Sequence, residues 1–247
     1  MQEGVDPALD FAANIICSSD LTDIRYLYRF GEYITENEIG MAKFLNTLSE
    51  EEIQAMARTF TEGYRTGFVL TGKDITKKKT VNIRFQLGFE RMVKAAIEQF
   101  KAMDLKPVIY RSAVHSVNKK QHHRIGYYGA IPNPQFEYDH KDDAALYLDH
   151  EFVQRKLRVL QVAYEQVKGL AAVHGGPACM ETFGETPFAP EKRKEACTLT
   201  SHQQKLQVTY DNEAGQIVNR YIKGEERSFT IIAYPVMEIG EQFEEIF

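Results

Sequence analysis

The 247-residue sequence lacks several features that would define its class at once. It has no tryptophan and only three cysteines, Cys17, Cys179 and Cys197, which are widely spaced and form no CxxC pair. A disulfide framework or a structural zinc site is therefore not expected, and a reducing cytoplasm is the predicted location. Each thiol lies in an apolar or helical context, which is typical of an inert cysteine rather than a nucleophile.

Targeting and membrane signals are also missing. The first residues, MQEGVDPALDF, contain no basic region followed by an apolar run, so we predict no secretory signal. No stretch of about 18 apolar residues occurs, so we predict no membrane span. The net charge of −5 argues against a general nucleic-acid binder, whose affinity depends on neutralising phosphates.

Nucleotide-binding and catalytic signatures are absent as well. The turn FQLGFE has one glycine, Gly88, whereas the dinucleotide motif GxGxxG needs three to bring the backbone close to a pyrophosphate. The sequence contains no GxxxxGK[ST], HExxH or GxSxG. We therefore assign no catalytic, cofactor-binding or metal-binding residue from motifs alone.

What is present is an ordinary globular composition, 43% hydrophobic and 26% charged, which allows a packed core. Residues 1–72 are predicted to be a helical lead-in segment, because apolar residues recur at helical spacing through most of it. Ser49 and Glu52 have the spacing of a capping box, and Leu48 and Ile53 that of a hydrophobic staple. A helix should therefore begin at this point.

Residues 73–247 are predicted to form an α/β domain. The polar stretch GKDITKKK (72–79) is interpreted as a solvated turn at the boundary. The alternating strand TVNIRF, the amphipathic helix LGFERMVKAAIEQFKAM and the short strand LKPVIYR follow it. A strand, a helix and a strand with short joints form a βαβ unit, whose strands should be parallel with a right-handed crossover.

Two more helices and two more strands are expected after this unit. The helix that begins near His150 should end at Gly175, Gly176 and Pro177, with His174 as a histidine at the helix end. The strand ACMETFG and the helix LTSHQQKLQVTYDNEAGQIVNRYIKG come next. The strand RSFTIIAYP is so apolar that it should be covered on both faces. The predicted fold is α/β: a parallel-type sheet with flanking helices, Rossmann-like and three-layered, preceded by a helical segment.

A long irregular stretch, residues 112–140, lies between the βαβ unit and the helix that begins near His150. It contains a basic cluster beside two tyrosines: Lys119, Lys120, His122, His123, Arg124, Tyr127 and Tyr128. Basic residues beside aromatic ones can bind single-stranded nucleic acid. In an acidic chain, a single short cluster favours a solvated loop, or a loop that docks on another part of a larger protein.

The run EYDHKDD (137–143) is the densest group of potential metal ligands. Its donors are Glu137, Asp139, His140, Asp142 and Asp143. Donors within one short run rarely converge on one ion without a dedicated loop, and the EF-hand pattern is absent. Asp139 or Asp142 can instead cap a helix, and Asp149 can cap the helix that begins near His150. A helix start, a functional polar cluster and a metal site all stay open.

Three phrases resemble one known family. They are TVNIRFQLGFERMVKAAIEQFKAMDLKPVIYR, YDHKDDAALYLDHEFVQRKL and NRYIKGEERSFTIIAYPVMEIG. They are similar to clostridial leucyl aminopeptidases of the thermophilic metalloaminopeptidase family, relatives of aminopeptidase T and aminopeptidase S. The resemblance runs from about residue 10 to the end of the sequence. It implies an N-terminal α/β domain with a parallel sheet, followed by a catalytic domain that holds two divalent ions of the zinc or cobalt class.

In the family, that later domain supplies the glutamate, histidine, tyrosine and aspartate ligands. The sequence ends at GEQFEEIF, before any of them would appear, so no ligand or catalytic residue is carried over. The resemblance implies an inactive accessory domain, residues 73–247 with the lead-in, of an enzyme that removes N-terminal residues from peptides. Its partners would be its own C-terminal catalytic domain, the peptide substrate and a second copy in a homodimer, with no nucleic acid and no membrane.

Two alternatives come from other classes of protein. One is a free-standing α/β binding module that holds a small or anionic ligand through the basic loop 112–140. The other is a small metallohydrolase that uses Asp139, His140 and Asp142. Under the family interpretation, the same loop is expected to face the catalytic domain.

Overall fold

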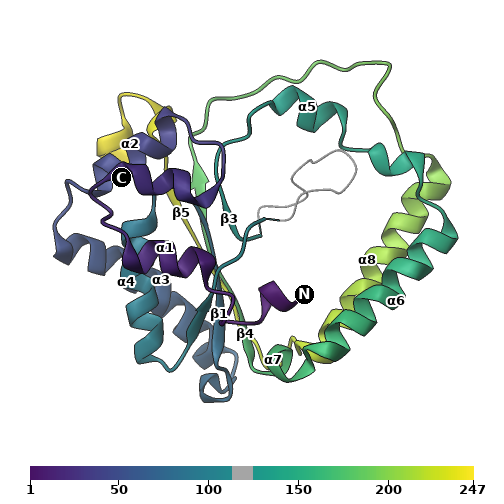
Figure 1. Ribbon diagram of the computed structural model, residues 1–247, viewed down its shortest axis with the longest axis horizontal. Helices are drawn as coiled ribbons and strands as arrows, with labels where there is room; N and C mark the ends of the chain where they lie inside the picture. Colours follow the sequence, from purple (N-terminus) through teal and green to yellow (C-terminus); the bar gives the residue numbers. More distant parts are fainter. Residues whose placement is uncertain (113–124) are drawn as a thin grey trace.

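The computed structural model describes residues 1–112 and 125–247, and its centre is a five-stranded sheet (Figure 1). The strands are β1 (Thr80–Gln86), β2 (Lys106–Val108), β3 (Tyr127–Tyr128), β4 (His174–Phe183) and β5 (Thr230–Pro235). Their order is β2-β1-β4-β5, with β3 also paired to β1, and these pairings are parallel. The predicted α/β class, with N-terminal helices before the sheet and helices beside it, is confirmed.

After an all-helical start, α-helices follow β1, β3, β4 and β5. The α-helices are α1 (Phe11–Ser18), α2 (Glu36–Leu45), α3 (Glu50–Leu70), α4 (Glu90–Ala102), α5 (Pro134–Asp139), α6 (His150–Gln166), α7 (Lys168–Ala172), α8 (Ser201–Tyr221) and α9 (Phe243–Ile246). The 3-10 helices are η1 (Gln2–Gly4), η2 (Ile24–Phe30), η3 (Ile75–Lys77), η4 (Asp143–Leu146) and η5 (Met237–Ile239). Within the part of the chain that the structure describes, no helix is both long enough and apolar enough to cross a membrane.

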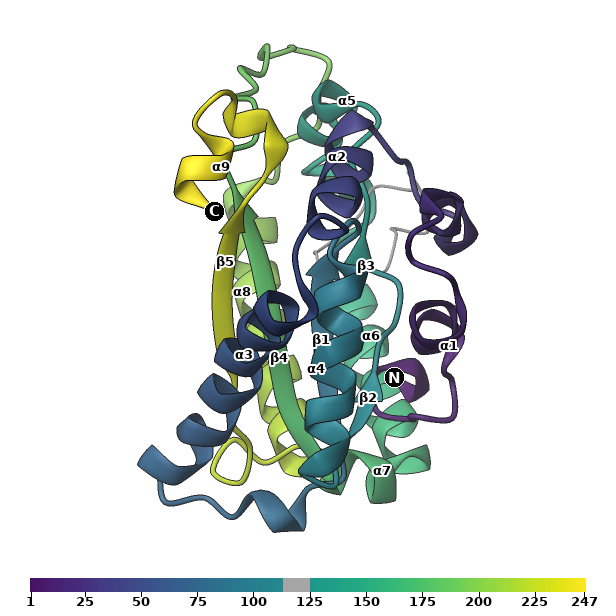
Figure 2. The ribbon, with the colours of Figure 1, turned by 90° about the vertical axis from the view of Figure 1, so that its left-hand side faces the viewer.

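Helices α3 and α4 cover one face of the sheet (Figure 2). Val81, Ile83 and Phe85 of β1 are fully buried in the same hydrophobic core as these helices. Burying a side chain of this size contributes about 1.5–3 kcal/mol. The alternation seen in TVNIRF therefore places an apolar row under α3 and α4, as predicted.

The start of α3 forms as the sequence predicts. The Glu52 backbone N–H donates to Ser49 Oγ at 3.2 Å, and the Ser49 backbone N–H donates to Glu52 Oε2 at 2.8 Å. Ile53 is buried and Leu48 packs against the same core. The capping box is confirmed.

The helices before residue 72 share one core with the sheet. Ile16 of α1, Leu27 of η2 and Phe60 of α3 are all completely buried in the cluster that contains Ile83 of β1. The predicted lead-in segment thus packs directly on the α/β elements.

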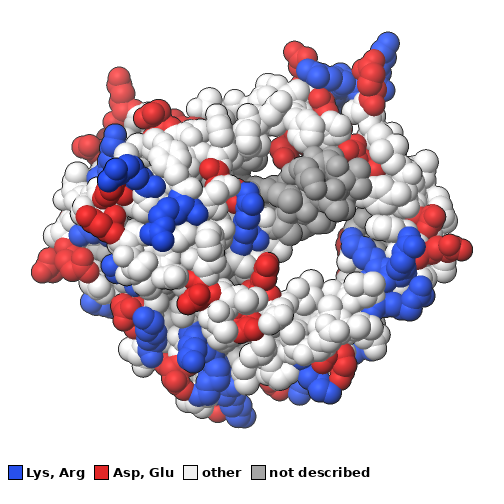
Figure 3. All heavy atoms as spheres, viewed as in Figure 1, with Lys and Arg blue, Asp and Glu red and all other residues white. Residues whose placement is uncertain are grey.

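Helices α6 and α8 form a pair that we call the helical arm. Leu157, Leu206 and Ile217 lie in a second hydrophobic cluster between them, and the rings of Tyr164 and Tyr221 stack at 5.3 Å. Both helices, which the sequence predicts, therefore bury an apolar face against each other. The arm lies across an opening from the sheet, and the space-filling view leaves a gap between the two (Figures 1 and 3).

Strand β5 differs from its prediction. It is an edge strand, paired on one side with β4. Phe229 and Ile231 are 64% and 54% exposed, so the expectation of a strand covered on both faces is wrong. Thr230 and Ile232, on the other face, lie against the helices. The apolar run RSFTIIAYP therefore has one face packed on the helices and one face that is exposed in the described structure.

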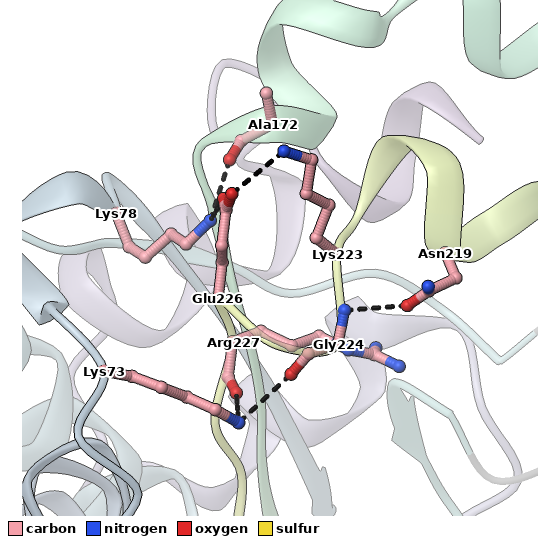
Figure 4. Close-up of polar contacts among 8 residues, drawn as sticks. All are labelled: Lys73, Lys78, Ala172, Asn219, Lys223, Gly224, Glu226 and Arg227. Carbon is pink, nitrogen blue, oxygen red and sulfur yellow. Dashed lines mark hydrogen bonds and ion pairs between the residues drawn. The ribbon is translucent and has the colours of Figure 1, made fainter.

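The lysine-rich turn before β1 is only partly solvated, which corrects another prediction. Lys77 and Lys79 are exposed, but the Lys78 side chain is 2% exposed. Its Nζ donates to the Ala172 carbonyl oxygen at 2.9 Å and to Glu226 Oε2 at 3.1 Å (Figure 4). An ammonium group loses its hydration on burial, so these two oxygens replace water.

A second lysine binds the same loop after α8. Lys73 Nζ donates to the carbonyl oxygens of Arg227, at 2.6 Å, and Gly224, at 3.1 Å. Figure 4 shows Lys73 and Lys78 reaching the loop from the segment that precedes β1. The two lysines therefore fix the end of the arm that leads into β5.

We predict that Lys78→Met lowers the free energy of unfolding by about 1–3 kcal/mol, because it removes the hydrogen bonds that a buried ammonium group makes to the Ala172 carbonyl and Glu226. The matched control is Lys77→Met, which changes an exposed neighbour and should alter stability by no more than about 0.5 kcal/mol. Urea denaturation of both variants measures the difference. Equal midpoints for the two would contradict the assignment of Lys78 as an anchor.

Candidate functional site

The face of the sheet that points away from α3 and α4 is the candidate site. On β1 it carries the alternate residues Asn82, Arg84 and Gln86, which are polar. A parallel sheet is normally covered on both faces, yet β4 and β5 expose Glu181 and Ile231. Asn82 and Gln86 are buried, so the face is open around Arg84, Glu181 and Ile231, and we call this open part the uncovered face. In open α/β sheets, ligands bind near the carboxyl ends of the strands, which makes the uncovered face a candidate binding surface.

Strand register brings three different side chains into one row. Arg84 of β1 pairs with Cys179 of β4, and Cys179 pairs with Ile231 of β5. In parallel strands, paired residues lie side by side on the same face. Glu181 lies two residues after Cys179 and therefore shares this face.

Arg84 is held in place by a neighbour rather than by a carboxylate. Its Nε donates to Asn82 Oδ1 at 2.6 Å, and among the described residues it forms no ion pair. The charge of Arg84 acts on the groups around it. Burial raises the pKa of the Cys179 thiol, while the nearby guanidinium opposes the shift. The thiol therefore stays protonated at neutral pH.

These residues border a cavity of about 220 Å³. Its lining consists of Arg84, Tyr128, Cys179, Met180, Glu181 and Thr182. Behind it, the Thr182 hydroxyl lies 2.6 Å from Gln86 Oε1 and 2.8 Å from Glu185 Oε1, and Gln86 Nε2 donates to Glu38 Oε1 at 2.8 Å. This chain of polar contacts fixes the wall of the cavity at the carboxyl end of β1.

The run EYDHKDD does not bring three of its donors to one point. Asp139 accepts from Gln135 Nε2 at 2.6 Å and pairs with Arg193 at 3.4 Å. His140 Nδ1 instead lies 2.8 Å from Asp143 Oδ2. Residues 1–112 and 125–247 contain no group of three or more His, Cys, Asp or Glu side chains placed to hold an ion. The metal-site interpretation of this run therefore has no geometric support.

The helix caps in this region are only partly as expected. Asp149 caps α6, since its Oδ1 accepts from the Phe152 backbone N–H at 2.7 Å, and that prediction is confirmed. Neither Asp139 nor Asp142 caps a helix with its side chain, because Asp139 is the last residue of α5 and Asp142 precedes η4 without a side-chain bond to its backbone. Asn133 caps α5, with Oδ1 accepting from the Phe136 N–H at 3.0 Å. The sequence interpretation overlooked Asn133, although Asn followed by Pro is a typical helix start.

The basic cluster of the loop 112–140 lies outside the described residues. Its members are Lys119, Lys120, His122, His123 and Arg124. Tyr127 and Tyr128, which follow them, form β3 and are buried. The Tyr127 ring packs 5.1 Å from that of Phe30, so it belongs to the core and is not available for stacking on a base.

His174 is not a histidine at a helix end, which corrects the prediction. Helix α7 ends at Ala172, and His174 is the first residue of β4, buried with Nδ1 3.1 Å from Thr80 Oγ1. Burial lowers the pKa of His174 to about 4, and the charge of Arg227 adds to the shift. The ring is therefore neutral at physiological pH and makes no charge–dipole contact.

Glu90 is a buried acid that the sequence interpretation missed. It opens α4, directly after β1, and its Oε2 accepts from the Tyr26 hydroxyl at 2.6 Å and the Gly88 N–H at 3.0 Å. Burial raises the pKa of Glu90 to about 7, and the charge of Glu38 contributes to the shift. The sequence signal for this buried acid is that Glu90 is the only acidic residue in the turn FQLGFE, two positions after Gly88.

Comparisons with protein-family models, curated proteins and solved structures give no match. The resemblance to the thermophilic metalloaminopeptidases therefore stays a prediction.

We predict that Glu90→Gln flattens the pH dependence of stability between pH 4.5 and 7. In this window the unfolded acid is ionised, whereas the folded acid keeps its proton, so wild-type stability falls as pH rises. The loss reaches the order of 3 kcal/mol above pH 7, at 1.36 kcal/mol per unit of pKa. Urea unfolding at several pH values measures it. The exposed Glu213→Gln is the control, and parallel curves for wild type and Glu90→Gln would refute the prediction.

We predict the opposite slope for the buried histidine. Unfolded His174 gains a proton near pH 6.5, but the folded ring gains one only near pH 4, so its contribution to stability is lost as pH falls through this window. His174→Gln should therefore lose less stability on acidification than wild type, as followed by thermal unfolding. The exposed His202→Gln serves as control. A variant that loses stability as steeply as wild type would contradict the buried neutral ring.

Proposed function

We propose that the chain is the N-terminal, non-catalytic α/β domain of a dinuclear-metal aminopeptidase, a hydrolase that removes N-terminal residues from peptides. One observation carries the proposal. The parallel sheet that the family resemblance implies is present, and two of the three resembling phrases contribute strands to it. The first phrase is β1–α4–β2, and the third runs from the end of α8 through β5 to η5.

In this proposal the chemistry belongs to a separate catalytic domain. Two divalent metal ions held there would activate a water molecule for attack on the peptide. The acidic run 137–143 does not fit such ions, because Asp139 is paired with Gln135 and Arg193 while His140 and Asp143 are paired with each other. No step of catalysis is therefore assigned to residues of this chain.

The role left for the chain is to support the catalytic domain and control access to it. Exposed apolar residues near the end of the chain favour such contacts. They are Met237 in η5 and Ile246 in α9, two elements that contact each other. Large apolar side chains grouped on a surface commonly mark an interface with another domain or subunit. The partners proposed are the catalytic domain, a second copy and the peptide substrate.

The test is to isolate the natural polypeptide with an antibody against this chain, from cells that make it. The expected polypeptide is larger than the 28.3 kDa of this sequence. It should hydrolyse a leucine anilide in the presence of zinc or cobalt and lose this activity to a chelator. The recombinant 247-residue chain, assayed in parallel, should bind no metal stoichiometrically and show no hydrolysis.

The other outcomes separate the alternatives. A natural polypeptide of about the size of this chain and without peptidase activity would favour a free-standing binding module. Stoichiometric metal in the recombinant chain, lost in His140→Ala, would favour a small metallohydrolase. Either result would overturn the aminopeptidase proposal.

A further inference from the structure

The uncovered face places a basic, an acidic and an apolar side chain around one residue, Cys179. The guanidinium of Arg84, the exposed carboxylate of Glu181 and the exposed apolar side chain of Ile231 all surround Cys179. Burial raises the pKa of this thiol most, the charge of Arg84 and a hydrogen bond from its guanidinium lower the pKa, and the charge of Glu181 raises it. Both charges therefore act at the same point. The thiol lies between a cation, an anion and an apolar group.

Arg84 has donors available for a ligand. Its Nε is used by Asn82 Oδ1 at 2.6 Å, and this bond fixes the plane of the guanidinium. The terminal NH2 groups meet no carboxylate within ion-pair distance among the residues described. A planar guanidinium of known orientation suits the two oxygens of a carboxylate, which it can bind through two parallel hydrogen bonds.

Glu181 and Arg84 border the same cavity without pairing with each other. No ion pair within 4.0 Å joins them in the described part of the chain, although each has a charge that would attract the other. Separate charges of opposite sign in one cavity are complementary to a ligand that carries both signs. The cavity of about 220 Å³ corresponds to roughly seven water molecules at about 30 Å³ each, which limits the ligand to a small molecule or the end of a chain.

The apolar side of the row is equally defined. Ile231 of β5 lies beside Cys179 of β4. Phe229, two residues before Ile231, points to the same face of the sheet because side chains alternate along a strand. Both are more than half exposed. An apolar group placed over Cys179 would cover Ile231 and remove its surface from water, which contributes about 25 cal/mol for each Å².

We propose that this face binds the α-carboxylate of an aliphatic amino acid or of a peptide end, with the carboxylate on Arg84 and the side chain over Cys179 toward Ile231. In a free amino acid the α-ammonium group lies toward Glu181. A peptide end has no such ammonium at its last residue and uses Arg84 and Ile231 alone. The site does not depend on the proposed peptidase function.

The experiment is an NMR titration of the whole 247-residue chain, observing the Ile231 methyl groups and the Arg84 Nε–H signal. The probes are leucine, N-acetyl-leucine, leucinamide and acetate. Leucine and N-acetyl-leucine should give saturable shifts at both signals. Leucinamide, which lacks the carboxylate, and acetate, which lacks the apolar side chain, should bind at least tenfold more weakly than leucine. This result is independent of metal content and of peptide hydrolysis.

Comparing leucine with N-acetyl-leucine shows whether the carboxylate belongs to a free amino acid or to a peptide end. Tighter binding of leucine than of N-acetyl-leucine indicates the free amino acid, and this preference should disappear in Glu181→Gln. Equal binding of the two indicates a peptide end. If Glu181 only competes for Arg84, Glu181→Gln will instead strengthen the binding of acetate and leucine alike, and the zwitterion arrangement will be wrong.

Two variants complete the test. Arg84→Gln should weaken leucine binding at least tenfold, whereas Arg220→Gln, an exposed arginine on α8, should leave it unchanged. Ile231→Ser, a change at an exposed edge position, should weaken leucine but not acetate. Should Arg84→Gln fail to fold, the comparison of leucine with leucinamide on the wild-type chain still decides. Equal shifts from these two, or no saturable shift from leucine and N-acetyl-leucine, would overturn the proposal.

Discussion

The structure depends on the alternation of side chains along β1. Its apolar residues, Val81, Ile83 and Phe85, are fully buried on the helical side, while its polar residues point the other way. Because β1 pairs with β2, β3 and β4, this one strand fixes the orientation of the whole sheet. A register slip of one residue would exchange the two faces and place Arg84 under α3 and α4. The core and the uncovered face are thus two consequences of the same seven residues.

Local patterns predicted the fold class and strands β1, β2, β4 and β5, but not β3 or α5, which lie in the stretch predicted to be irregular. The capping box of Ser49 and Glu52 and the amphipathic stripe of α8 depend on residues within a few turns of one another, so periodicity and spacing report them directly. Exposure of Ile231 and burial of Lys78 depend instead on partners far along the chain. The sequence of a strand does not show whether the strand lies at the edge of a sheet, and the sequence around a lysine does not show which carbonyl oxygen it will bind. His174 was misassigned for this reason, since its partner Thr80 belongs to another strand.

The same distinction separates the two candidate sites. The run 137–143 resembles a metal site because its potential ligands are neighbours in sequence. Neighbours of this kind can bind one another instead, as His140 and Asp143 do. Arg84, Glu181 and Ile231 come from three strands and carry no sequence motif. Only the parallel register places them on one face around Cys179. The polar positions within TVNIRF were the one signal of this face that the sequence contained.

The parallel pairing of β1 with β4 also determines when the protein can fold. Thr80 and His174 are separated by 94 positions, and closing so long a loop is entropically costly and slow. At a synthesis rate of roughly 5–20 residues per second, β1 waits about 5–20 s on the ribosome for its neighbour. Helices α3 and α4, made on either side of β1, can cover its apolar residues during that time. The edge that later accepts β4 has no such cover, and it is the part of the nascent chain most exposed to wrong pairing.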